Sequence, residues 1–64
     1  MNEYRVEYSY INSFGKRVAE CEYQIDHYAS KAAEAVERMY SADPTFRIEG
    51  VWISRNGRWE AAEW

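Results

Sequence analysis

The sequence predicts an α+β domain in which two β-hairpins form a four-stranded, mainly antiparallel sheet and one helix packs on one face. Only residues 30–41 repeat apolar side chains at helical spacing. The chain on either side of them alternates between apolar and polar side chains, as strands do. Because a lone helix must bury its apolar stripe against another layer, we expect the order ββαββ in a single domain over residues 1–64.

The first hairpin is predicted over residues 4–25. Residues 4–11 alternate, with tyrosine or valine at each even position, and the turn that follows contains Gly15, which can take a positive φ. Residues 17–25 alternate again, and their more apolar set is Ala19, Cys21, Tyr23 and Ile25. Since paired antiparallel strands share their faces, we expect this set to join the tyrosines against the helix.

The helix is expected to begin at Ser30, whose hydroxyl can cap a free backbone N–H group, and to end before Pro44, which cannot extend it. Its apolar stripe consists of Ala29, Ala32, Ala33, Val36, Met39 and Tyr40. The polar side includes Glu34 and Arg38, which are four residues apart and form a favourable pair. The pattern therefore predicts one buried and one solvated helix face.

The second hairpin is predicted around Asn56-Gly57, the strongest short-range signal for a type I′ turn, because both central residues of that turn need a positive φ. This turn places Trp52 and Trp59 on one face of the hairpin. Further apolar residues fall on its other face: Val51, Ile53, Ala62 and Trp64. One helix cannot cover both faces, so two alternatives stay open. Either a β-bulge at Gly50 exchanges which side faces the core, or the hairpin exposes apolar side chains to water.

The composition describes a small globular domain without covalent or metal support. A chain of 64 residues, 47% hydrophobic and 30% charged, lies near the lower size limit for a self-supporting core. One cysteine excludes an internal disulfide, and with one histidine it is too few for a closed zinc site, so we expect no metal and no cofactor. The chain has no apolar run of membrane-spanning length and no signal-peptide pattern at its start, which predicts a soluble, cytoplasmic protein.

Few side chains offer catalytic chemistry. Asp26 and His27 are the one acid and imidazole pair, but neighbours in an extended segment point apart and no nucleophile stands at a recognisable spacing. Cys21 would need a basic neighbour to become a reactive thiolate, and its flanks are Glu20 and Glu22. We therefore expect a protein that is not an enzyme.

The aromatic residues point to binding instead. Six tyrosines, three tryptophans and two phenylalanines are more ring surface than one helix can cover, and tyrosine, tryptophan and arginine dominate protein interfaces. We expect a partner protein to be contacted by Trp52, Arg55, Arg58 and Trp59, with Ile53 and Trp64 next. The net charge of -3 argues against gripping a phosphate backbone. Two further hypotheses are a homodimer formed through the apolar face and a small nucleic-acid-binding protein.

The layout of the chain resembles that of small phage-encoded accessory proteins. The residues that carry the resemblance are the strand start Tyr4-Arg5-Val6, the turn Gly15-Lys16, the helix with Ala-Val-Glu-Arg-Met-Tyr-Ser, and the closing Arg-Ile-Glu-Gly-Val-Trp-Ile and Asn-Gly-Arg-Trp. Such proteins include anti-CRISPR proteins and inhibitors of host RNA polymerase, and the resemblance implies an inhibitor that binds a host protein or complex. The helix end Glu37-Arg38-Met39-Tyr40-Ser41 is similar to that of the archaeal ribosomal protein LX family, which would imply RNA binding. The order of elements is also similar to that of immunoglobulin-binding bacterial domains.

Overall fold

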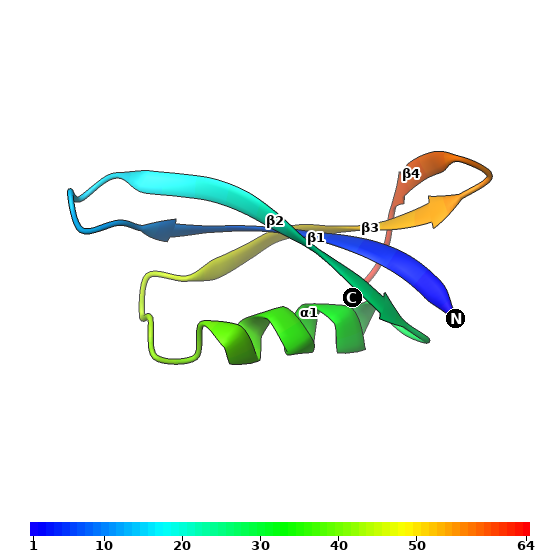
Figure 1. The fold of residues 1–64 in the computed structure, drawn as a ribbon, viewed down its shortest axis with the longest axis horizontal. Coiled ribbons are helices and arrows are strands. Elements are labelled where there is room, and N and C mark those ends of the chain that lie inside the picture. The colour runs from blue at the N-terminus through cyan, green and yellow to red at the C-terminus, as the bar shows by residue number, and fades with distance from the viewer.

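The computed structural model describes all 64 residues and has the predicted order of elements. The elements are β1 (Asn2–Ile11), β2 (Arg17–Asp26), α1 (Ala29–Met39), β3 (Arg47–Arg55) and β4 (Arg58–Ala61). The four strands form one sheet in the order β2-β1-β3-β4, and every neighbouring pair is antiparallel. Figure 1 shows α1 along one face of this sheet and no element over the opposite face, which we call the open face. No helix is long and apolar enough to cross a membrane.

The core lies between α1 and the two central strands. Its buried residues are Tyr4, Val6 and Tyr8 of β1, Ala29, Ala32, Ala33 and Val36 of α1, and Val51 and Ile53 of β3. The helix contributes mainly alanines, whose small side chains let its backbone approach the sheet closely. Burying a side chain such as Val36 stabilises the fold by about 1.5–3 kcal/mol.

The start of α1 differs from the prediction. The N-cap residue is Tyr28, whose backbone is extended and whose side chain makes no capping hydrogen bond, so the assignment of the cap to Ser30 is wrong. Ala29 is buried and already helical, because the first turn must reach the core, and Ser30 is exposed. The predicted pair of Glu34 and Arg38 is confirmed, with Arg38 Nη2 2.7 Å from Glu34 Oε1.

The end of the helix stripe also differs. Met39 was expected in the stripe but is 56% exposed. Tyr40 and Phe46 close this end of the core instead, since both rings pack on Tyr8, with centroid distances of 4.9 and 5.3 Å. The Tyr8 and Tyr40 hydroxyls are 2.7 Å apart and hydrogen-bonded. Burial and this hydrogen bond raise the pKa of Tyr8 well above its ordinary value of 10.0.

A β-bulge in β3 decides between the two alternatives for the second hairpin. Glu7 pairs with Gly50 and Tyr8 with Ile48, so Glu49 is the extra residue. Ile48 before the bulge and Val51 after it therefore both face α1, although their positions differ in parity. The predicted bulge that exchanges faces is therefore present, but its extra residue is Glu49, next to Gly50, which itself pairs with Glu7. The type I′ turn also has the expected geometry, with φ of 50° at Asn56 and 75° at Gly57.

The face assigned to the apolar set of β2 is wrong. Tyr4 pairs with Gln24 and Tyr8 with Glu20, so Glu20, Glu22 and Gln24 lie on the helix side. The predicted set of Ala19, Cys21, Tyr23 and Ile25 lies on the open face. The turn between the strands fixes this register. The Asn12 backbone N–H donates to the Lys16 carbonyl (2.8 Å), so these two even-numbered residues stand opposite each other. Even positions of β1 therefore pair with even positions of β2 along the whole hairpin. No residue of β2 is buried, so the helix-side positions of β2 can be polar. The buried residues of the sheet lie on β1 and β3, and all of them except Ser9 belong to the core.

Candidate interaction surface

One end of the open face carries a stack of aromatic rings around an arginine. The guanidinium carbon of Arg5 lies 5.7 Å from the ring centroid of Trp52 and 5.1 Å from that of Trp59. The Tyr23 ring is tilted against Trp59 at a centroid distance of 5.8 Å. These four side chains, which we call the Arg5 stack, come from all four strands. A cation–π contact stabilises by about 0.5–1 kcal/mol at an exposed site and more when it is desolvated.

Glu7 anchors the stack from the middle of β1. Its Oε1 accepts a hydrogen bond from Trp52 Nε1 at 2.6 Å, and its Oε2 lies 3.7 Å from Arg5 Nε. Arg5 Nε is buried and has no hydrogen-bond partner, and no other nitrogen of the guanidinium donates to the protein. Since stacking uses the faces of the guanidinium plane and Nε is buried, the terminal Nη groups are the donors that stay free for another molecule.

The outer side of the stack is open to solvent. Tyr23 is 58% exposed and Ile25, two residues further along β2 on the same face, is 67% exposed. Trp52 and Trp59 are half-buried. Apolar surface of this kind adjoins a fixed positive charge, so this end of the open face offers both ring surface and hydrogen-bond donors.

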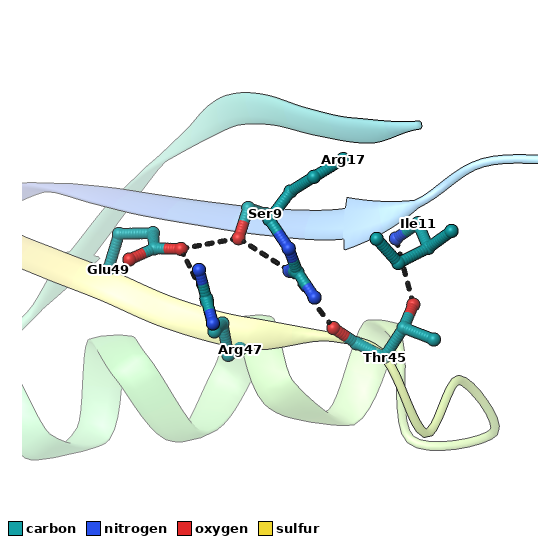
Figure 2. A network of polar contacts seen from close by, with 6 residues as sticks. All are labelled: Ser9, Ile11, Arg17, Thr45, Arg47 and Glu49. Carbon is teal, nitrogen blue, oxygen red and sulfur yellow. Dashed lines mark hydrogen bonds and ion pairs between the residues drawn. The ribbon is translucent and has the colours of Figure 1, made fainter. Parts of the chain in front are cut away.

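The other end of the open face is a closed polar network, shown in Figure 2. Buried Ser9 donates its hydroxyl to Glu49 and accepts from Arg17 Nη1 at 2.9 Å. Arg17 Nη1 also donates to the Thr45 carbonyl (3.2 Å), and Arg47 Nε donates to Glu49 Oε2 (2.7 Å). The hydrogen bonds from Ser9 and Arg47 hold the pKa of Glu49 below its ordinary value. Glu49 is thus paired with Arg47, whereas Arg17 donates to neutral oxygens.

Thr45 ties this network to the segment before β3. Its hydroxyl accepts a hydrogen bond from the Ile11 N–H at 2.8 Å and donates to Asp43 Oδ1 at 2.7 Å. Asp43 Oδ1 also accepts from the Thr45 N–H at 2.8 Å. These bonds lower the pKa of Asp43. The end of β1 is thereby fixed to the chain that enters β3.

Two hollows in the surface carry little chemistry. A hollow of about 370 Å³ lies between the polar network and the Arg5 stack, lined by Glu7, Cys21 and Glu49 among others. A second, of about 410 Å³, lies beside the start of α1 and includes His27. The Asp26 carboxylate accepts from the His27 backbone N–H at 2.7 Å rather than from its imidazole, so it does not orient the ring. No group of three His, Cys, Asp or Glu residues is arranged to hold a metal ion.

The structure separates the residues predicted to contact a partner. Trp52 and Trp59 do share the open face, since Trp52 pairs with Ala61 and Ser54 with Trp59. Arg55 and Arg58 pair with each other on the opposite side, the side of Ile53, at the tip of the hairpin. The four predicted residues therefore do not form one patch.

Two further predicted contact residues lie elsewhere. Ile53 is 6% exposed and belongs to the core, so its side chain is not available on a contact surface. Trp64 is 55% exposed, and Figure 1 shows the C-terminus on the helix side of the sheet, so Trp64 does not extend the Arg5 stack. The stack contains two residues that the sequence did not single out, Arg5 and Tyr23. The signal for Arg5 is the pairing of β1 with β3, and the signal for Tyr23 is the pairing of β1 with β2, which places Tyr23 opposite Arg5. Both depend on the register between strands.

Comparison with protein-family models, with curated proteins and with solved structures found no match for this chain.

Proposed function

We propose that this chain is a non-enzymatic protein-binding module whose contact surface is the Arg5 stack together with the exposed side of β2. One observation carries the proposal. Arg5, Trp52, Trp59 and Tyr23 are assembled across four strands on the sheet face that no element of the chain covers. A ring cluster without a covering layer is typical of a surface that another macromolecule completes.

The composition of the stack favours a protein as that macromolecule. Tryptophan, tyrosine and arginine contribute the largest binding energies in protein interfaces because their rigid surfaces leave water at small entropic cost. Arg5 is held by two rings before any partner arrives, so little side-chain freedom is lost on binding. The longer extents of the chain, 39 and 19 Å, are compatible with a contact of about 800 Å² per partner, the usual size for a stable complex.

An inhibitor of a host protein, which the layout resemblance implies, is a module of this kind. Blocking a partner requires surface complementarity and no reactive group, so it agrees with a surface that holds rings and one arginine. The homodimer and the nucleic-acid-binding protein are the competing hypotheses. Light scattering at high concentration tests the first, and titration with single-stranded RNA and DNA at low salt tests the second.

The test of the proposal is quantitative affinity capture from a lysate with wild-type and variant baits. Trp59→Ala removes the ring that contacts both Arg5 and Tyr23, and we expect it to reduce capture of a specific partner at least about tenfold. Phe14→Ala is the matched control, because Phe14 is 87% exposed at the far turn and also loses one ring.

Circular dichroism and thermal melting verify that both variants are folded at the capture temperature. Equal capture of every partner by the two variants would remove the Arg5 stack from the contact surface. Loss of the same partner from both variants would mean that ring loss acts non-specifically, and would also contradict the proposal.

A further inference from the structure

β2 forms a long free edge of the sheet. It has ten residues, and its pairing with β1 is continuous from Asn2↔Asp26 to Ile11↔Arg17 without a bulge. The other edge strand, β4, has four. Natural proteins commonly protect edges with prolines, charged side chains, bulges or a covering element. β2 has no proline, lysine or bulge and no element pairs with its outer side, so its protection comes from the charged residues Arg17, Glu20, Glu22 and Asp26.

The backbone groups that face outward along β2 follow from the hydrogen bonds of its neighbours. The Asn12 N–H donates to the Lys16 carbonyl, and the Ile11 N–H turns the other way, to Thr45. In an antiparallel pair the inward and outward residues alternate, so even positions of β2 bond to β1 and odd positions face solvent. The N–H and carbonyl groups directed to the free edge are those of Ala19, Cys21, Tyr23 and Ile25.

The side chains of β2 alternate in character along the same edge. The odd residues are the apolar set on the open face, next to the Arg5 stack. The even residues Glu20 and Glu22 lie on the helix side, and neither takes part in an ion pair, although Glu20 Oε2 accepts a hydrogen bond from the Tyr10 hydroxyl. An added strand would therefore meet apolar side chains on one of its faces and carboxylates without a cationic partner on the other.

A second copy of this chain fits the edge poorly. In the two-fold antiparallel registers that overlap most of β2, Glu22 stands opposite Glu22 of the other copy, or Glu20 opposite Glu22. Like charges directly opposite each other across a strand pair are destabilising. The occupant must instead bring positive charge to these positions.

We propose that the free edge of β2 binds an extended segment of a partner protein in which Lys or Arg alternates with apolar residues. The segment pairs with the outward backbone groups of the odd positions, places its basic side chains beside Glu20 and Glu22, and places its apolar side chains beside Cys21 and Tyr23. This inference deepens the proposed function and rests on it, since it names the partner's chemistry. The contact with this segment is made by the backbone of β2 rather than by the tryptophans.

The experiment titrates the full-length, isotope-labelled chain with a capped peptide of about eight residues in which Lys and Val alternate. Amide resonances of Ala19, Cys21, Tyr23 and Ile25 should shift and become protected from hydrogen exchange, because these N–H groups gain acceptors. A peptide of the same composition with its lysines and valines in two blocks should bind at least about tenfold more weakly, since it cannot place all its charges on one face.

Two kinds of variant separate the backbone and charge contributions. Cys21→Pro removes an outward N–H group without removing a bond to β1, and it should weaken binding of the alternating peptide at least about tenfold. The double variant E20K/E22K should lose that binding and gain binding of an alternating Glu-Val peptide. The charge-matched control E37K/E63K, at exposed positions without ion pairs, should retain binding within about threefold at physiological salt. The charge swap tests the proposal even where the proline variant does not fold.

Equal binding of the alternating and block peptides, or shifts confined to other strands, would overturn the inference. Concentration-dependent shifts of the same amides without peptide would place a second copy on the edge and overturn it too. These outcomes leave the proposed function testable, because Trp59→Ala can still abolish capture of a partner when the edge binds no peptide. The reverse result, edge binding with capture unaffected by Trp59→Ala, would retain the edge and reject the Arg5 stack.

Discussion

The coupling between Arg5 and Trp59 can be measured directly by a double-mutant cycle. Arg5→Met keeps an unbranched side chain but removes the guanidinium that lies 5.1 Å from the Trp59 centroid. The Arg5 side chain is 25% exposed, so the contact is partly desolvated and its expected coupling free energy is about 1 kcal/mol. Because Arg5 also lies over Trp52, Arg5→Met alone should cost about 2 kcal/mol.

Urea unfolding of the wild type, Arg5→Met, Trp59→Ala and the double variant gives the cycle. Arg5→Met should lower Tm by about 4–8 °C for each kcal/mol of unfolding free energy lost in a domain of this size. Arg58→Met is the control, since Arg58 is exposed on the opposite side of the hairpin, and its unfolding free energy should change by less than about 0.5 kcal/mol. Strict additivity of Arg5→Met and Trp59→Ala would refute the view that the stack is assembled before binding.

Three further predictions concern other parts of the fold. Tyr8→Phe should cost about 1 kcal/mol by removing the hydrogen bond to Tyr40. Tyr8→Phe should also reduce the loss of unfolding free energy at alkaline pH. The raised pKa of Tyr8 gives stability that is complete below pH 10.0 and is lost as pH rises beyond it, and urea unfolding at several pH values measures this loss. Glu49→Gln should reduce the loss of unfolding free energy at acid pH. The lowered pKa of Glu49 gives stability that is present above pH 4.5 and is lost as pH falls through the pKa that Glu49 has in the folded protein. An acid unfolding transition that is unchanged in this variant would contradict the role of the Ser9 bond. Gly57→Ala, at φ of 75°, should cost about 1–2 kcal/mol, whereas a neutral effect on Tm would contradict the turn geometry.

Local signals in the sequence were sufficient for the order of elements. The helical spacing over α1, the Asn56-Gly57 turn and the conflict of faces around Gly50 each depend on neighbouring residues, and each has its counterpart in the structure. The cap is an exception. Ser30 has the right side chain for an N-cap, but the burial of Ala29 draws the helix start towards Tyr28, and a packing requirement outweighs a capping preference.

Signals that depend on register were not available from the sequence. The face of β2 depends on how the turn after Asn12 closes, and a change of one residue there would exchange Tyr23 with Glu22. The Arg5 stack depends on a second register, that of β1 against β3. Tyrosines alternate with polar residues along β1, so Arg5 reads as an ordinary solvated residue until Trp52 is known to stand opposite it.

The bulge at Glu49 is what allows Ile48 and Val51 to lie against the helix together, although their positions differ in parity. Deleting Glu49 would restore regular alternation and leave Val51, Trp52 and Ile53 on the faces they have now. Pairing Glu49 as an ordinary strand residue would have the opposite result, because every later position would change sides. Val51 and Ile53 would turn to water, and Trp52 would be forced against the alanines of the helix. The hydrophobic interior of this sheet therefore depends on one residue being left out of the ladder.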